Sequence, residues 1–229
     1  NIYGYNKIGG STLYTKKLFW KNENKHNFEY QCDLLSLIGI HDIDVELRYK
    51  TTFRGIDINN IIKQRNVGIL IAPCASTSQR ELSIDCWIYI IKKLLVKEKQ
   101  IFLLGFGVRE EGICYDIKRH IKSDKLTSLC SKLKLFETLL MIKDCELFLG
   151  VESFLGHVAA FYQKKQISFM HGACNRYQWE PYRNPNCYVL RSKIQCSPCY
   201  YPSRCNNPHA CVIYALQDIN DALDFIGIE

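Results

Sequence analysis

From Val67 onward, short apolar runs alternate with segments of helical periodicity. Residues 67–72 form a β-rich apolar run that Pro73 ends, and the apolar positions from Trp87 to Leu95 then follow the spacing of an amphipathic helix. Further strands are expected at 101–104, 126–130, 147–151 and 166–170, and further helices at about 109–121, 135–145, 156–162 and 216–226. Because parallel strands need crossover connections, this alternation predicts an α/β fold with an open, doubly wound parallel sheet.

The first 65 residues lack this alternation. Residues 1–25 are rich in Tyr, Asn and Lys without a clear period, and residues 41–65 are polar and mixed, as in a connecting segment. Between them, the apolar positions from Phe28 to Ile38 predict a short helix that Gly39 ends. We therefore expect a domain boundary near residue 66.

Composition limits the functional classes. With 47% hydrophobic and 23% charged residues, 229 residues can form one or two domains with a core. No apolar run approaches the about 20 residues that span a bilayer, and Asn1 begins no recognisable signal peptide, so we expect a soluble, cytoplasmic protein without a transmembrane segment. The net charge of +7 fits either a solvated surface or attraction to phosphate-bearing ligands. No basic run is dense enough to predict nucleic-acid binding.

Four cysteines near the C-terminus form a C-x2-C-x5-C-x5-C cluster: Cys196, Cys199, Cys205 and Cys211. Four thiolates can close a tetrahedral site around one metal ion and leave no open position for catalysis, so a structural metal centre is predicted. Ligand type does not separate iron from zinc. A zinc-binding nucleic-acid protein is a less favoured alternative, because only Tyr200, Tyr201 and Arg204 supply flanking aromatic and basic groups.

The other eight cysteines are scattered, mostly within apolar stretches: Cys32, Cys74, Cys86, Cys114, Cys130, Cys145, Cys174 and Cys187. They are expected to be buried free thiols, because a secreted disulfide scaffold would be shorter and richer in loops.

Three segments follow predicted strands, where open α/β sheets bind ligands. After the first strand, the hydroxyls of Ser76 and Thr77 and the guanidinium of Arg80 could hold a diphosphate; the alternative is a hydroxyl-rich loop that caps the next helix. After the second strand, Gly105 opens a Gly-Phe-Gly turn, and Glu110 or Glu111 could accept hydrogen bonds from a ribose. A tight turn before an acidic helix start explains that segment equally well.

The third segment, 152–160, reads ESFLGHVAA. Glu152 and Ser153 fall at a strand end, and His157 follows in a helix of small residues, so polar groups should meet at the mouth of the crevice.

Five segments of the chain, taken in order, resemble glycosyltransferase family 9, the bacterial heptosyltransferases. They are ILIAP…STSQR, IFLLGFG…E, LFETLLMIKDCELFLGVESFLGHVAA, QISFMHG and CSPC…C…C. That family typically reads Asp-Ser/Thr-Gly-Pro-x-His-x-Ala-Ala at 152–160. The match is good at Ser153, His157, Ala159 and Ala160 and departs at Glu152, Phe154 and Leu155. Arg80 stands where the family has a phosphate-binding Lys.

The resemblance implies a GT-B fold, in which two Rossmann-like domains face a cleft and the C-terminal one binds ADP-heptose without a catalytic metal. It makes residues 66–229 that donor domain and residues 1–65 a remnant of the N-terminal domain with its linker. The implied donor-binding residues are Ser76, Thr77, Arg80, Gly105, Glu110, Glu111, Glu152, Ser153, Phe154, Leu155, Gly156 and His157. The family's base lies in the N-terminal domain, and no residue here is assigned that role.

The cysteine cluster resembles the metal finger of the protein O-heptosyltransferases that modify autotransporter adhesins, which implies iron. The family resemblance as a whole implies that the acceptor is a lipopolysaccharide core sugar or a Ser of a surface protein. The competing hypothesis is a non-catalytic nucleotide- or metal-binding module, or a fragment without its acceptor domain. The sequence leaves a monomer and a homo-oligomer both open.

Overall fold

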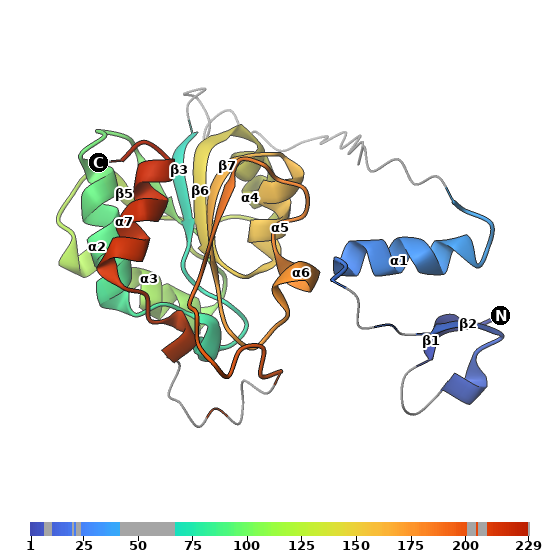
Figure 1. Ribbon diagram of the computed structural model, residues 1–229. Helices are drawn as coiled ribbons and strands as arrows, with labels where there is room; N and C mark the ends of the chain where they lie inside the picture. The colour runs from blue at the N-terminus through green and yellow to red at the C-terminus, as the bar shows by residue number, and fades with distance from the viewer. Residues whose placement is uncertain are drawn as a thin grey trace. The chain divides into compact units, whose positions relative to one another are not determined.

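The computed structural model describes residues 1–6, 11–19, 21, 24–41, 67–200, 205 and 210–228 (Figure 1). These residues form two compact units. The smaller holds the described residues up to His41 together with Tyr177–Trp179, and the larger holds the remainder from Val67 onward. Most of the expected connecting segment, 42–65, lies outside the described residues. No helix of the described part is long and apolar enough to cross a membrane.

The smaller unit combines two short parallel strands with one helix. Strands β1 (Tyr3–Asn6) and β2 (Lys16–Phe19) pair in parallel, with a 3-10 turn, η1 (Ser11–Leu13), between them. Helix α1 (Asn27–Ser36) confirms the predicted helix, and Gly39 follows it with a φ of 84°. The ring of Tyr5 on β1 packs edge-on against Tyr30 of α1, with centroids 5.7 Å apart. The two strands were not predicted, because residues 1–25 show no period of 2.

The larger unit contains a six-stranded sheet in the order β5-β4-β3-β6-β7-β8, and every pairing is parallel. Its strands are β3 (Val67–Ala72), β4 (Ile101–Leu103), β5 (Leu126–Ser128), β6 (Cys145–Val151), β7 (Lys165–Met170) and β8 (Cys187–Arg191). The predicted α/β class and parallel sheet are confirmed. Strand β8 was not predicted, although Tyr188, Val189 and Leu190 are an apolar, β-prone run.

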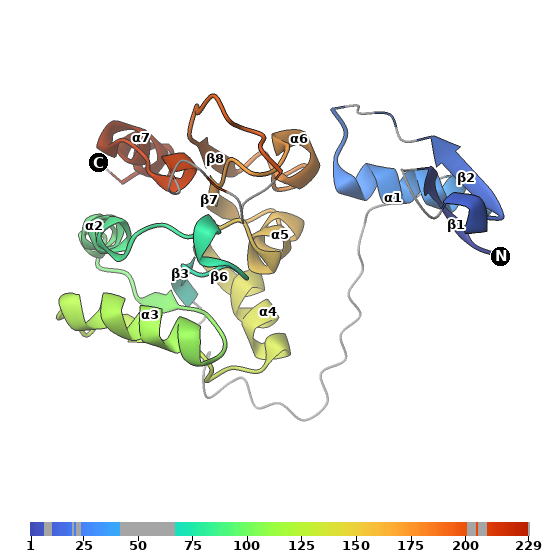
Figure 2. The same cartoon turned by 90° about the horizontal axis from the view of Figure 1, so that it is seen from below.

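Helices cover both faces of the sheet (Figures 1 and 2). Helices α2 (Ile84–Leu95), α3 (Val108–His120) and α7 (Leu216–Phe225) lie on one face, and α4 (Leu135–Asp144) and α5 (Phe154–Phe161) on the other. Shorter turns occur at η3 (Ser78–Arg80), α6 (Arg176–Trp179) and η5 (Ala210–Val212). The helices predicted from periodicity are all present, with ends shifted by a few residues.

Two apolar cores result from the alternation of side chains along the strands. On β3, Ile69 and Ile71 belong to the core shared with α2, α3 and α7, whereas Leu70 and Ala72 belong to the core shared with α4 and α5. Trp87 of α2 is fully buried in the first core and packs edge-on against Phe169, with ring centroids 5.3 Å apart.

The scattered cysteines lie mostly in these interiors. Five of the eight are buried, namely Cys74, Cys114, Cys130, Cys145 and Cys174, while Cys32, Cys86 and Cys187 are half-buried. The prediction of buried thiols is thus confirmed for the five and too strong for the other three.

Strand β3 marks the point where the strand order reverses. The chain runs from β3 outward through β4 and β5, and then returns to place β6 on the other side of β3. In doubly wound sheets, the carboxyl ends of the strands at such a switch point form the ligand crevice. The segment 73–80 follows β3 and Glu152 follows β6, so both border this point.

Candidate functional site

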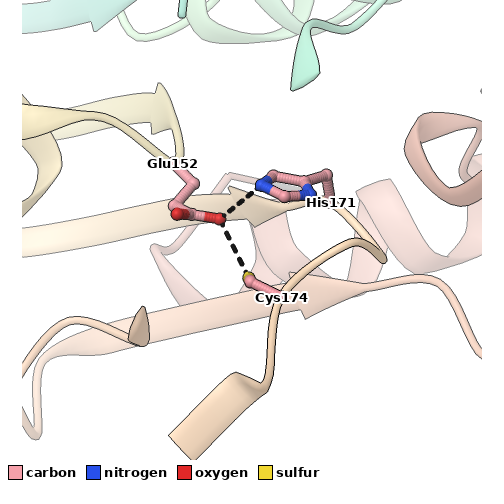
Figure 3. A group of neighbouring side chains, drawn as sticks. All are labelled: Glu152, His171 and Cys174. Atoms are coloured by element: carbon pink, nitrogen blue, oxygen red, sulfur yellow. Dashed lines mark hydrogen bonds and ion pairs between the residues drawn. The ribbon is translucent and has the colours of Figure 1, made fainter. Parts of the chain in front are cut away.

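Glu152, which directly follows β6, is a buried carboxylate surrounded by hydrogen-bond donors (Figure 3). Its Oε2 lies 2.8 Å from Nε2 of His171 and accepts a hydrogen bond from the Cys174 thiol at 3.2 Å. Its Oε1 lies 3.8 Å from Nη1 of Arg80. His171 and Cys174 follow β7, so three neighbouring strands of the sheet, β3, β6 and β7, contribute to this cluster.

The donors keep the Glu152 carboxylate ionised despite its burial. Burial alone would raise the pKa of Glu152, but His171, the Cys174 thiol and the charge of Arg80 together outweigh that effect and lower the pKa. The same surroundings raise the pKa of Cys174 to about 12, through burial and then the charge of Glu152. At neutral pH the pair is therefore a carboxylate that accepts and a thiol that donates.

A backbone contact assigns the tautomer of His171. The amide of Ala173 donates to Nδ1 of His171 at 3.0 Å, so Nδ1 is the unprotonated nitrogen and Nε2 carries the proton. That proton points at Oε2 of Glu152. The short turn at 171–174 thus fixes the direction of the imidazole donor.

Arg191 of β8 supports the turn from the other side. Its Nη2 donates to the backbone carbonyl of Cys174 and to Oγ of Ser197 at 2.7 Å. Its Nη1 is buried and has no partner among the described residues. Arg191 was not singled out in the sequence, because the strand that carries it was not predicted.

The start of α5 presents polar groups beside Glu152. Ser153 is the N-cap residue, yet its side chain makes no capping hydrogen bond, and its hydroxyl is buried without a partner among the described residues. The first amides of a helix have no intrahelical acceptor, and together with the helix dipole they favour an anion. His157, one turn further along, is half-buried; burial lowers its pKa and the charge of Glu152 opposes that shift, so the imidazole is mostly neutral at neutral pH.

The remaining residues of this segment have different surroundings. Phe154 is 59% exposed, and Leu155 packs against the core under α4 and α5. Gly156 is buried, and its carbonyl accepts a hydrogen bond from Nε2 of Gln166 at 3.0 Å. Gly156 therefore belongs to the packing of α5 on the sheet.

In the segment after β3, Ser76 and Thr77 are exposed, and the Arg80 guanidinium donates to Oγ of Ser76. This contact ties the Arg80 side chain to the loop that carries the two predicted hydroxyl groups. Arg80 therefore stands between the loop and Glu152, where its remaining N–H groups can meet an anion.

The segment after β4 is organised by Glu110. Its Oε2 accepts a hydrogen bond from the amide of Phe106 at 2.9 Å, and a side chain at Gly105 would come within 2.8 Å of the same oxygen. Gly107 adopts a φ of 90°, which glycine tolerates best. Glu110 thus holds the turn, as the simpler of the two sequence interpretations had it, whereas the carboxylate of Glu111 is exposed.

Comparison with known sequences identifies the family of this chain. The sequence profile of glycosyltransferase family 9 (heptosyltransferase) matches residues 13–209. The chain belongs to glycosyltransferase family 9. It is 25% identical over 211 residues to lipooligosaccharide heptosyltransferase 2 of Campylobacter jejuni, an alignment that covers 87% of this chain and 65% of that protein. The chain therefore spans just under two thirds of the length of this curated relative.

Solved structures of the family share the fold. The glycosyl transferase family 9 protein from Veillonella parvula superposes with a TM-score of 0.75 at 13% identity, over 98% of this chain and 66% of that one. The E. coli heptosyltransferase WaaC with ADP superposes with a TM-score of 0.59 at 15% identity, over 79% of this chain and 54% of that one. The six-stranded sheet of this family 9 chain thus corresponds to one Rossmann-like domain of the GT-B fold.

Among the described residues of this family 9 chain, the four predicted cysteine ligands are not brought together in one group. In a tetrahedral site with metal–sulfur bonds of about 2.3 Å, the sulfur atoms lie about 3.8 Å apart. Within the described ranges, one group of potential metal ligands has its ligand atoms within 4.8 Å of one another, and it consists of Glu152, His171 and Cys174. No three cysteines of the cluster meet that condition there.

The four cysteines of the cluster differ in exposure. Cys196 and Cys205 are exposed, whereas Cys199 and Cys211 are half-buried and both border Gly172. Short loops give the thiols reach but do not by themselves make four sulfur atoms converge, so the four-cysteine site stays a prediction.

Proposed function

We propose that this chain binds a nucleotide-activated sugar of the ADP-heptose type and contributes to the transfer of its heptose to a sugar of a lipopolysaccharide or lipooligosaccharide core. The observation that carries the proposal is the pairing of Arg80 with Glu152 at the switch point, beside the start of α5. One sugar diphosphate needs both parts: donors for its phosphates and an acceptor for its hydroxyls.

The diphosphate side of the site is built from Arg80, the hydroxyls of Ser76 and Thr77, and the first amides of α5. As the sugar leaves, negative charge grows on the diphosphate, and fixed N–H donors stabilise it without rearranging. Ser153 adds a hydroxyl that has no other partner among the described residues. We assign the ribose of the nucleotide to Glu111 rather than Glu110, because Glu110 already holds the turn at Phe106.

The sugar side of the site is Glu152. A carboxylate repels phosphate but accepts hydrogen bonds from sugar hydroxyls, and the lowered pKa keeps it in the accepting form. The same lowered pKa makes Glu152 a weak base, so it is a poor candidate for deprotonating the acceptor. We therefore give Glu152 a binding role.

The names of the relatives support the choice of acceptor. The Campylobacter proteins are named as lipooligosaccharide heptosyltransferases, which favours a core sugar over the Ser of a surface protein. Because the chain spans only part of these relatives, the complete transfer reaction remains part of this proposal.

Calorimetric titration with ADP, ADP-heptose and UDP-glucose tests donor binding. We expect micromolar binding of both adenine ligands, tighter for ADP-heptose, and much weaker binding of UDP-glucose. Incubation with ADP-heptose and either a truncated core oligosaccharide or a serine-containing peptide then tests transfer. Donor binding without transfer to either acceptor would favour a non-catalytic donor-binding module. A chain that is folded but binds neither adenine ligand would contradict the proposal.

A further inference from the structure

The cluster of Glu152, His171 and Cys174 has two chemical interpretations. All three side chains are buried, and their ligand atoms lie within 4.8 Å of one another, which is compatible with a metal site. They also form a hydrogen-bonded set in which two donors converge on one carboxylate oxygen (Figure 3). The two interpretations require different proton positions.

The proton on His171 decides between them. A metal ion would need the lone pair of Nε2, and the ring proton would then sit on Nδ1. In the structure, Nδ1 accepts the amide hydrogen of Ala173, so a proton there would face another proton. The guanidinium of Arg80, 3.8 Å from the carboxylate, would also repel a cation. The geometry favours hydrogen bonding.

We propose that His171 and Cys174 are positioning residues that hold the Glu152 carboxylate in one orientation for the sugar of the donor. Both saturate Oε2, which leaves Oε1, the oxygen nearer Arg80, to accept a hydroxyl of the ligand. This inference rests on the proposed function, because it concerns how the same site selects a sugar.

The length of the Glu152 side chain explains why its carboxylate benefits from positioning residues. A glutamate has one more rotatable bond than the aspartate typical at this position, so a free Glu152 would lose more conformational entropy on binding a sugar. Two fixed donors remove that freedom before the ligand arrives. Arg191 anchors the turn that carries them, through the carbonyl of Cys174.

Two matched pairs of variants test the role. Cys174→Ser keeps an O–H donor and Cys174→Ala loses it; His171→Gln keeps an N–H near the position of Nε2 and His171→Leu loses it. Calorimetry with ADP and with ADP-heptose separates the diphosphate from the sugar. We expect Cys174→Ala and His171→Leu to weaken ADP-heptose binding about 3- to 10-fold while ADP binding stays within about twofold, and Cys174→Ser and His171→Gln to restore most of the loss.

Several outcomes would overturn the inference. If the variants weakened the binding of ADP and of ADP-heptose equally, or if Cys174→Ser and Cys174→Ala behaved identically, His171 and Cys174 would have only a structural role. In an E152Q background the donor-removing variants should add no further loss; an additive loss contradicts action through Glu152. A cobalt–thiolate absorption band in the wild type that Cys174→Ala abolishes would show a metal site.

One measurement is independent of the ligand. Nitrogen-15 NMR of the histidine side chains should show His171 protonated at Nε2 near neutral pH, and a proton on Nδ1 overturns the inference whether or not a donor binds. If the wild type binds neither adenine ligand, the proposed function fails and the sugar-positioning role fails with it. If it binds both and the matched variants do not differ, only the positioning role fails.

Discussion

Arg80 and Glu152 face each other across the switch point of the sheet, with Nη1 of the guanidinium 3.8 Å from Oε1 of the carboxylate. Arg80 comes from the loop after β3, and Glu152 comes from the end of β6, the strand that returns to the other side of β3. The separation is longer than a charge-assisted hydrogen bond of about 2.7–2.9 Å. Both groups therefore retain capacity for a ligand that carries an anion and hydroxyls.

Substitution of Arg80 should weaken ADP binding in proportion to the donors that are lost. We expect Arg80→Ala to raise the dissociation constant for ADP by about tenfold or more, because hydrogen bonds between charged groups contribute about 1.5–3 kcal/mol each. Arg80→Lys keeps the charge without the planar fork and should show a smaller loss. Calorimetry at constant ionic strength provides the measurement.

The matched control for Arg80 is Lys92→Ala, which removes one positive charge from an exposed position on α2. It should leave the affinity for ADP unchanged. If Lys92→Ala and Arg80→Ala weakened ADP binding equally, the effect would be one of net charge, and Arg80 would not contact the diphosphate.

Glu152 should make the stability of the chain depend on pH in the acidic range. Its pKa in the folded chain is below the ordinary value of 4.5, so the unfolded chain binds more protons. The stabilisation is fully present above pH 4.5 and is lost as the pH falls through the folded pKa. Urea unfolding at pH values from about 6 down to about 3 should show a shallower loss for Glu152→Gln than for the wild type.

Glu111→Gln serves as the control for this titration, because the Glu111 side chain is exposed. It should follow the wild-type dependence on pH. A Glu152→Gln variant with the same slope as the wild type would show that the donors around the carboxylate do not favour its ionised form.

Periodicity predicted most of the larger unit because the strands that pack between two layers of helices are continuous apolar runs. β3 was predicted with its observed bounds, Val67–Ala72. β8 (Cys187–Arg191) was missed because the helix before it, α6, has only four residues, too few to show a helical period, so the alternation of strand and helix did not mark this strand.

The sequence singled out Arg80 and Glu152 as candidate site residues but could not show which groups fix the Glu152 carboxylate. Cys174 lies 22 residues after Glu152 and follows a different strand. Their contact arises from the pairing of β6 with β7 and from the turn in which Ala173 binds the His171 ring. For Glu110, the sequence suggested a contact with the ribose of a ligand. In the structure, its carboxylate instead accepts a hydrogen bond from the amide of Phe106 in the preceding turn.

Trp87 should be the most costly single truncation in the core of the larger unit. Its side chain is fully buried and packs against Phe169 on β7, and truncation of a buried Trp to Ala costs about 3–5 kcal/mol of unfolding free energy. Equilibrium urea unfolding of Trp87→Ala measures this loss. Val96→Ala, at a side chain that is 73% exposed at the end of α2, should change the stability by less than about 0.5 kcal/mol.

Ser153→Ala should separate ligand binding from stability. The Ser153 hydroxyl is buried and has no partner among the described residues, so its removal breaks no hydrogen bond recorded there, and the free energy of unfolding should change by less than about 1 kcal/mol or rise slightly. ADP binding should nevertheless weaken several-fold, because the hydroxyl caps no amide of α5 and is available to a phosphate oxygen. Urea unfolding and calorimetry on the same samples test both halves. A large loss of stability with unchanged ADP affinity would instead make Ser153 a structural cap of α5.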